Sequence, residues 1–219
     1  MIINLSHQKG GTGKSTIAYH LAKTFEDKGF KVTILDLDIQ DTCIHFNHMR
    51  EKPKTNIINI EEDTELITTI ENANEDEIFI IDSGGFDSSL TRLAIMGADI
   101  NITPIADKVS EILAITNKYS KILKEIATAI EEPIETYVLL NKIHIFANKF
   151  EHIEKLIDPH KQMKILRTII RERGIYDKAL RVGLTVQEAT NFKGHNDATN
   201  ELNSLADELL KIYKQGEKR

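Results

Sequence analysis

The chain contains a single cysteine, Cys43, among its 219 residues. One cysteine excludes an intramolecular disulfide framework, and it excludes a metal cluster held by two cysteines of the same chain. Four prolines and 11 glycines are spread along the sequence without a flexible linker or an internal repeat, so we expect one domain over residues 1–219. No apolar run approaches the roughly 18–20 residues of a membrane span, and the first residues are not those of a signal peptide. These absences favour a single cytoplasmic domain.

Basic residues are also in deficit. The chain has 28 Lys+Arg against 34 Asp+Glu, a formal net charge of −6, and this sum argues against a nucleic-acid binder. The deficit is uneven, because residues 1–141 hold 13 basic and 23 acidic side chains, whereas residues 142–193 hold 11 and six. A localised basic stretch is the electrostatic footprint of a protein that binds a phosphate backbone, although a solvated face or pairing with the local acids would have the same composition. We call residues 142–193 the basic segment, and five of its side chains fall within 15 positions: Arg167, Arg171, Arg173, Lys178 and Arg181.

Short apolar runs alternate with helical patterns along the whole chain. Hydrophobic residues make up 41% and charged residues 28%, which is typical of a globular domain with a full core. The apolar runs predict strands at residues 2–5, 32–35, 56–60, 78–81, 100–103, 136–140 and 163–166, and their composition predicts burial on both faces. Helix periodicity is clear at residues 15–27, 110–130 and 201–213. We therefore expect an α/β fold with a mostly parallel, twisted sheet flanked by helices on both faces.

A glycine-rich loop joins the first expected strand to the first expected helix, and its sequence is Lys9-Gly10-Gly11-Thr12-Gly13-Lys14-Ser15-Thr16. Strand, loop, Gly-Lys-Ser and helix are the context of a P-loop, in which backbone N–H groups and the helix N-terminus surround phosphate oxygens. We expect Lys14 to reach the β- and γ-phosphates, the Ser15 hydroxyl to bind Mg²⁺ and Thr16 to contact the α-phosphate. The sequence therefore predicts a P-loop NTPase that binds ATP or ADP with Mg²⁺.

A second lysine distinguishes this loop from the ordinary Walker A sequence. Gln8 stands where that sequence has glycine, and Lys9 precedes the glycine pair. In this the chain resembles the deviant Walker A ATPases of the ParA/MinD group, whose signature is Lys-Gly-Gly-x-Gly-Lys-Ser/Thr. The resemblance implies an ATP-dependent homodimer in which Lys9 reaches the nucleotide of the partner subunit. A solvated loop lysine is the alternative.

Three further segments match the group in order. Asp36-Leu37-Asp38-Ile39-Gln40 is similar to its Asp-x-Asp-Pro-Gln segment, with isoleucine in place of proline. The resemblance implies that Asp38 positions the attacking water and that Asp36 supports the metal shell. Asp82, which follows an apolar strand as in a Walker B motif, would bind Mg²⁺ through water. By resemblance, Asn141 reads the adenine base, an amide being able to donate and accept at once. The matches cover residues 1–142.

Features outside the site favour the small ParA proteins of plasmid or chromosome partition. The P-loop begins at residue 9, so we expect no N-terminal helix-turn-helix domain. In ParA-like proteins the C-terminal third binds nonspecific DNA in the ATP dimer, which by resemblance assigns that contact to the five basic side chains named above. The resemblance implies a weak Mg²⁺-dependent ATPase on the nucleoid, stimulated by a ParB-like centromere-binding protein.

Three alternatives remain. A MinD-like membrane ATPase would need an amphipathic C-terminal helix, and residues 201–213 do carry an apolar stripe, which Asp207 and Glu208 interrupt. Docking of this helix on the domain explains the stripe better, so we expect no membrane binding. A ParA-like protein could also position another cargo. A metabolic synthase would need a substrate pocket that the sequence does not identify, and the single cysteine argues against a metal-cluster reductase.

Overall fold

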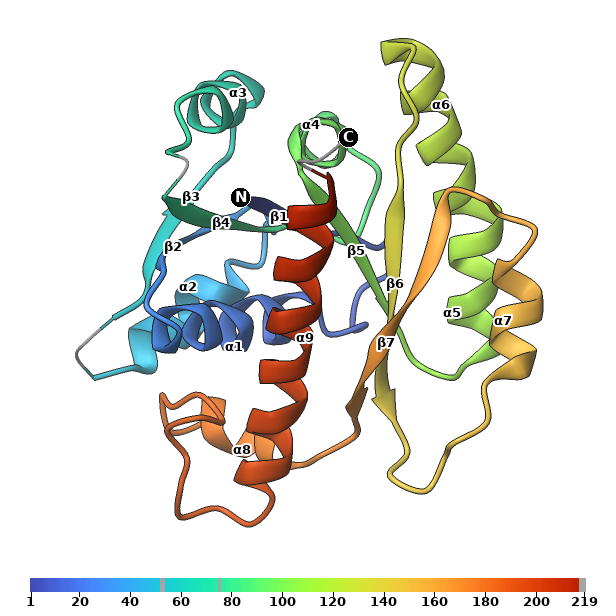
Figure 1. Ribbon diagram of the computed structural model, residues 1–219. Coiled ribbons are helices and arrows are strands. Elements are labelled where there is room, and N and C mark those ends of the chain that lie inside the picture. Colours follow the sequence, from blue (N-terminus) through green and yellow to red (C-terminus); the bar gives the residue numbers. More distant parts are fainter. Residues whose placement is uncertain (52–53, 75, 217–219) are drawn as a thin grey trace.

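The computed structural model describes residues 1–51, 54–74 and 76–216, and in this part of the chain seven strands form one sheet (Figure 1). The strand order is β3-β2-β4-β1-β5-β6-β7, and each pair of neighbours is parallel. The strands are β1 (Ile2–Leu5), β2 (Lys31–Asp36), β3 (Asn56–Asn59), β4 (Glu77–Asp82), β5 (Ile100–Ile105), β6 (Thr136–Ile143) and β7 (Met163–Arg171). This topology confirms the predicted α/β class.

Helices cover both faces of the sheet, which makes three layers (Figure 1). One face carries α1 (Lys14–Asp27), α2 (Thr42–Met49), α8 (Ile175–Leu180) and α9 (His195–Gly216). The other carries α3 (Asp63–Glu71), α4 (Ser89–Gly97), α5 (Val109–Leu113), a π-helical stretch η1 (Ala114–Tyr119), α6 (Ser120–Ile130) and α7 (Glu151–Ile157).

The alternation of side chains along the central strands builds a core on each face. In β1, Ile3 and Leu5 belong to the core under α1 and α9, whereas Ile2 belongs to the core under α3 and α4. All four residues of β1 are buried, as expected for a strand covered on both faces. The edge strand β3 departs from this prediction, because three of its four residues are exposed. An edge strand that packs on one neighbour only cannot bury both faces.

Two elements are longer or more complex than the periodicity predicts. The strand expected at residues 163–166 continues to Arg171, so Arg167 and Arg171 lie on β7 rather than on a loop or helix. The helix expected at residues 110–130 is interrupted by six residues of π-helix, which end at the buried Tyr119. Single π-turns inside a helix are rare and recur at functional sites.

The C-terminal helix α9 docks on the domain. Leu202, Leu205 and Leu209 are completely buried between α1 and the sheet, so the apolar stripe found in the sequence is core. The carboxylate of Glu208 accepts the backbone N–H groups of Arg167 and Thr168 at 2.8 and 2.9 Å. No helix among the described residues is long and apolar enough to cross a membrane.

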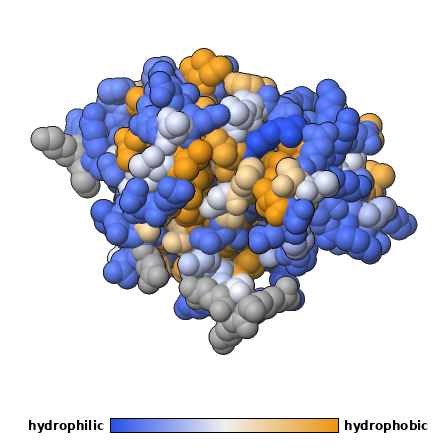
Figure 2. Space-filling view, turned by 90° about the horizontal axis from the view of Figure 1, so that it is seen from above, coloured by the Kyte–Doolittle hydropathy of each residue, from blue (hydrophilic) through white to orange (hydrophobic). Residues whose placement is uncertain are grey.

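Apolar side chains also gather in the middle of the face seen in Figure 2, which is the upper side of the molecule in Figure 1 and the side toward which the last turns of α9 point. Two grooves of about 610 and 420 Å³ lie beside the last turns of α9, and both are lined in part by Tyr213. Met1 lines the smaller groove, which places it at the amino ends of the strands. The glycine-rich loop lies at the opposite, carboxyl edge of the sheet.

Candidate nucleotide-binding site

The glycine-rich loop of residues 9–16 connects β1 to α1, as predicted. Gly11 and Gly13 have φ angles of 81° and 98°, in the left-handed region that favours glycine. Gly13 is the N-cap residue of α1. The loop therefore has the conformational freedom and the helix N-terminus that phosphate binding requires.

Strand β6 braces this loop from the side. The Nδ2 atom of Asn141 donates to the carbonyl of Thr12 at 2.7 Å, and Lys142 Nζ donates to the carbonyl of Gly11, also at 2.7 Å. The contact is close, since a Cβ atom added to Gly13 would lie 2.5 Å from Asn141 Nδ2. Asn141 is buried and uses its amide nitrogen on the loop, so its observed contact is to the phosphate loop. The predicted contact with adenine stays a prediction.

The two lysines of the loop have opposite environments. Lys14 is buried, and burial lowers the pKa of its ammonium group, while the nearby carboxylates of Asp82 and Asp38 act to raise it. Lys9 is exposed, and its Nζ atom donates to Ser110 Oγ at 3.2 Å on the surface of α5. Lys14 therefore points into its own site, whereas the Lys9 ammonium is accessible from outside.

His7 also belongs to the site. In the sequence, its position two residues before Lys9 is the one sign of this. His7 is buried, and its Nδ1 atom accepts the backbone N–H of Lys9 at 2.9 Å. Burial, together with the charges of Lys14 and Lys9, lowers the pKa of His7 to about 4. The imidazole is thus neutral at pH 7, which is the state that can accept this hydrogen bond and fix the start of the loop.

Two carboxylates end neighbouring strands beside Lys14. Asp36 and Asp82 are paired across β2 and β4, and both side chains are completely buried. Burial raises the pKa of Asp82 to about 7, and the Asp36 carboxylate adds to the rise. Asp36 accepts the backbone N–H groups of Cys43 and Ile44 at 3.1 and 3.3 Å and thereby holds the first turn of α2.

These residues fit a magnesium ion that arrives with a nucleotide. Within the described ranges, Asp82 Oδ1 is a buried oxygen without a hydrogen-bond partner. Ser15, the expected hydroxyl ligand, is the residue after Lys14 in the first turn of α1. No group of three or more His, Cys, Asp or Glu side chains in the described part of the chain could hold a metal alone. Mg²⁺ bound by phosphates needs only one or two protein carboxylates, so this sparse donor set is sufficient.

Asp38 lies in the loop between β2 and α2. It is half-buried, its Oδ1 atom accepts the backbone N–H of Gln40 at 3.1 Å, and its charge acts on Lys14. A groove of about 430 Å³ opens beside it, lined in part by Ile39 and Phe86. The loop after β4 closes the other side, since a Cβ atom on Gly85 would lie 3.2 Å from the backbone nitrogen of Gly10. The structure therefore brings Asp38 to the glycine-rich loop and leaves it accessible to water.

The five basic side chains predicted to bind DNA divide into two sets. Arg173 forms ion pairs with Asp197 and Glu201 of α9, at 2.9 and 2.8 Å, and Arg171 donates to the carbonyl of His144 at 3.1 Å. These two guanidinium groups hold the structure together.

The other three side chains, Arg167, Lys178 and Arg181, are exposed. Arg181 pairs with Asp177 at the surface, while Arg167 and Lys178 have no ion pair among the residues that the structure describes. Of the five side chains predicted to contact DNA, three are thus exposed and two are engaged within the domain.

The parallel sheet with a glycine-rich loop between β1 and α1 defines a P-loop NTPase fold. The family CbiA, described as the CobQ/CobB/MinD/ParA nucleotide binding domain, matches residues 3–186. The chain belongs to this family.

Two protein relatives match parts of the chain. Protein ParA of Rhizobium radiobacter is 32% identical over 110 residues, which are 49% of this chain and 49% of that protein. The uncharacterized protein MJECL24 of Methanocaldococcus jannaschii is 45% identical over 40 residues, which are 18% of this chain and 15% of that protein. The chain thus spans about half or less of the relatives it matches.

Solved structures resemble the fold over nearly the whole chain. The apo form of McdA from Cyanothece superposes with a TM-score of 0.72 at 16% identity and covers 95% of this chain and 98% of that one. A MinC:MinD cell division complex of Aquifex aeolicus gives 0.71 at 16% identity, with 96% of each chain covered. A putative plasmid partition protein of Borrelia burgdorferi bound to AMPPNP gives 0.67 at 16% identity, covering 96% and 98%. At these identities the likeness shows the fold.

Proposed function

We propose that the chain is a Mg²⁺-dependent ATPase that switches between a monomer and a DNA-binding dimer and serves in DNA partition. The observation that carries the proposal is the placement of Lys14. It is buried at the head of α1, behind the glycine-rich loop, with the carboxylates of Asp38 and Asp82 close enough to act on its pKa. A buried ammonium group beside backbone N–H donors is suited to the β- and γ-phosphates of a nucleotide.

Each residue of the site has a separate role in the proposed hydrolysis. The amides of residues 10–13 and the Lys14 ammonium bind and orient the phosphates, and Asn141 holds the loop in shape. Ser15 and Asp82 would hold a magnesium ion, which would supply neutralisation of charge on the phosphate oxygens. Asp38, half-buried at the open side of the loop, orients the attacking water. We expect slow intrinsic turnover that a partner protein accelerates, because an arginine supplied by a partner can raise the rate by about 10³–10⁵.

The exposed Lys9 and the residues around it support a dimer. Ile39, Val109 and Phe146 are 78%, 70% and 80% exposed and follow β2, β5 and β6. The glycine-rich loop follows β1, so all four segments lie at the carboxyl edge of the parallel sheet. Exposed apolar side chains around a charged loop are typical of an association surface. A second copy placed on this edge would bring each Lys9 to the nucleotide of the other subunit.

The exposed basic side chains Arg167, Lys178 and Arg181 are the proposed contact with nonspecific DNA. Each dimer would carry two such sets, and the contact would be to phosphates, because lysine and arginine neutralise the backbone without reading bases. ATP hydrolysis opens the dimer and releases the DNA. A ParB-like protein that accelerates hydrolysis would then clear DNA locally, which moves a bound plasmid or chromosome.

The test is DNA binding measured by fluorescence anisotropy with a random-sequence duplex. We expect binding that requires Mg²⁺-ATP and that weakens with salt, with a log–log slope of about −0.9 per phosphate neutralised. Lys178→Ala should lower the DNA affinity and the salt slope, while the matched control Lys121→Ala, an exposed lysine on the other face of the sheet, should not. DNA binding that is independent of ATP or of salt would overturn the proposal. ATP-dependent binding to anionic vesicles in place of DNA would favour the membrane-positioning alternative.

A further inference from the structure

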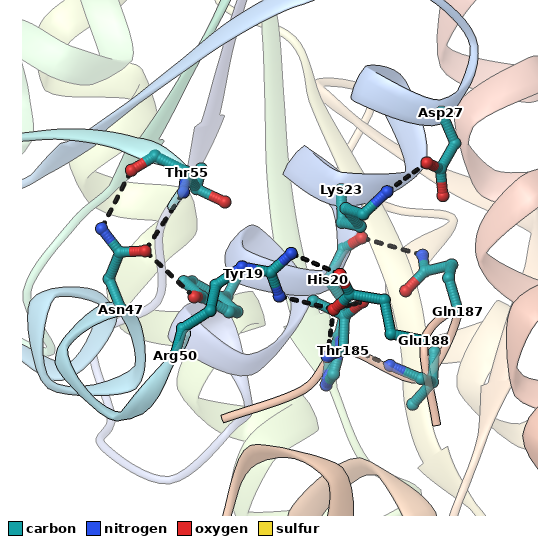
Figure 3. A network of polar contacts seen from close by, with 11 residues as sticks. Tyr19, His20, Lys23, Asp27, Asn47, Arg50, Thr55, Thr185, Gln187 and Glu188 are labelled. Atoms are coloured by element: carbon teal, nitrogen blue, oxygen red, sulfur yellow. Dashed lines mark hydrogen bonds and ion pairs between the residues drawn. The ribbon is translucent and has the colours of Figure 1, made fainter. Parts of the chain in front are cut away.

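A turn formed by residues 183–188, which we call the clamp, contacts the second half of α1 and the C-terminal end of α2 (Figure 3). The carboxylate of Glu188 accepts hydrogen bonds from both terminal guanidinium nitrogens of Arg50, the residue that caps the C-terminus of α2. The same carboxylate accepts the backbone N–H and the hydroxyl of Thr185, each at 2.9 Å. Gly183 has a φ of 69°, and a Cβ atom there would lie 2.1 Å from the carbonyl oxygen of Met49. The clamp therefore contacts the end of α2 in two ways, through the backbone of Gly183 and through the ion pair between Glu188 and Arg50.

The clamp holds α1 as well. The backbone N–H of Val186 donates to His20 Nδ1 at 3.3 Å, and Gln187 Nε2 donates to the carbonyl of His20 at 3.1 Å and to Thr24 Oγ1 at 2.5 Å. On its other side, His20 packs edge-on against Tyr176 of α8, with ring centroids 5.3 Å apart. The contacts thus tie three helices together at one point.

Both helices held by the clamp begin at the proposed nucleotide site. The first residue of α1 is Lys14. The first turn of α2 donates two amides to Asp36, the last residue of β2, which directly precedes the loop that carries Asp38. Helix α2 has eight residues, so it is a rod of about 12 Å, with a carboxylate bound at each end. A shift of the chain at the end of β2, from Asp36 to Asp38, would move this rod as a unit and act on the clamp through Arg50.

We propose that the clamp transmits the state of the nucleotide site to α8 and to two basic side chains, Lys178 within this helix and Arg181 directly after it. The inference rests on the proposed function for its two ligands, ATP and DNA. Helix α1 is anchored in the core by completely buried side chains such as Leu21 and Phe25 and serves as the fixed reference. Helix α2 is the mobile lever, and the Arg50–Glu188 ion pair passes its displacement to residues 183–188. The arrangement is a coupling between two sites, so each ligand should act on the other's affinity by the same factor.

Hydrogen–deuterium exchange of the full chain tests the coupling without DNA. We expect the backbone amides of Thr185 and Val186 to change their exchange rate when Mg²⁺ and a nonhydrolysable ATP analogue are added. Arg50→Lys and Glu188→Gln, which loosen the ion pair and keep a polar side chain, should abolish that change while the analogue still binds. The matched control Asp87→Asn alters an ion pair with Arg92 in which both side chains are more than one-third exposed, and it should keep the full response.

DNA binding provides the second measurement. In both clamp variants the ratio of DNA affinity with ATP to that without ATP should fall by about tenfold, within the range of typical allosteric couplings. The inference would be overturned if the wild type binds the nucleotide and the exchange rates of Thr185 and Val186 do not change. It would also be overturned if a clamp variant shows the same change in exchange as the wild type. If the wild type binds no nucleotide or no DNA, the proposed function fails instead, so the two failures are distinguishable. The exchange measurement on the wild type stands even if a variant unfolds.

Discussion

Asn141 and Thr12, which are 129 residues apart in the sequence, are joined by a hydrogen bond of 2.7 Å from the side-chain amide of one to the backbone carbonyl of the other. The bond fixes the glycine-rich loop against β6 before any ligand arrives. Both residues are buried, so neither group can exchange this partner for bulk water. The geometry of the phosphate loop therefore depends on a strand two positions away in the sheet.

Asn141→Asp should weaken nucleotide binding. The change replaces the donor with a carboxylate, which faces the carbonyl of Thr12 and leaves it unsatisfied, at a cost of about 1–3 kcal/mol. Isothermal titration calorimetry with ADP and Mg²⁺ measures the loss. Asn117→Asp, on the exposed surface of η1, is the matched control and should bind as the wild type does. Equal affinity in the two variants would mean that the contact does not shape the loop.

Lys9→Ala should abolish the ATP-dependent dimer and leave the nucleotide affinity of the monomer within about twofold of the wild type. The reason is that Lys9 is exposed and its ammonium group contacts Ser110 on the surface of α5, whereas Lys14 is buried behind the glycine-rich loop. Light scattering after gel filtration, with and without a nonhydrolysable ATP analogue, measures the dimer. Lys108→Ala changes another exposed lysine near α5 and should still dimerise. A dimer that persists in Lys9→Ala would remove the residue from the interface.

Asp38→Ala should slow ATP turnover by about 10²–10⁴, the range for the loss of a group that acts on the nucleophile. The ATP dimer should form normally and stay on DNA, because the step that releases it is blocked. Phosphate release and DNA dissociation rates measure the two effects. Asp41→Asn is the control in the same loop, since asparagine tolerates the left-handed φ of 48° found there. Turnover at the wild-type rate in Asp38→Ala would exclude this role.

His20 should make the folded state sensitive to acid. It is fully buried, and desolvation lowers its pKa to about 3, far below the value of about 6.5 in an unfolded chain. Between these two values the unfolded state binds a proton at His20 that the folded state does not, so the contribution of His20 to the free energy of unfolding should fall by about 1.4 kcal/mol for each pH unit from about 6.5 down to about 3. Denaturant unfolding at pH 7, 5 and 4 measures the slope.

The control for this prediction separates His20 from the other titrating groups. His20→Asn keeps an acceptor for the amide of Val186 and removes the titration, so its stability should depend less on pH over the same interval. His45→Asn changes an exposed histidine and should follow the wild type. Identical slopes in all three proteins would show that the burial of His20 is not what drives the acid sensitivity.

The sequence was sufficient to predict those features that depend only on neighbouring residues, such as the glycine-rich loop and the ends of the apolar strands. The loop of residues 9–16 lies between strand and helix as expected, because its glycines and the flanking periodicity require nothing from distant residues. The same holds for Asp36 and Asp82, which end strands whose apolar runs identify them. The class of the fold followed from the alternation of these runs with helices.

Contacts between distant elements could not be predicted, because local sequence does not determine them. The bond from Asn141 to Thr12 depends on β6 continuing three residues beyond its apolar run. The basic segment shows the limit most clearly, since nothing within it indicates that Arg173 is bound to two carboxylates on α9. The exposure of β3 was also missed, because Ile57 and Ile58 have the composition of a central strand although they lie on an edge.

The carboxylates of α9 have a consequence for assembly. Strand β7 ends the sheet on one side, and the outer edge of such a strand is ordinarily a template for pairing with a strand of another molecule. Here Glu208 accepts the amides of Arg167 and Thr168, and Glu201 accepts that of Arg171 at 3.0 Å. With these three donors occupied, the second half of β7 offers fewer free amides to a strand of another molecule. At this edge a second copy of the chain would therefore have to make its contacts through side chains and loops.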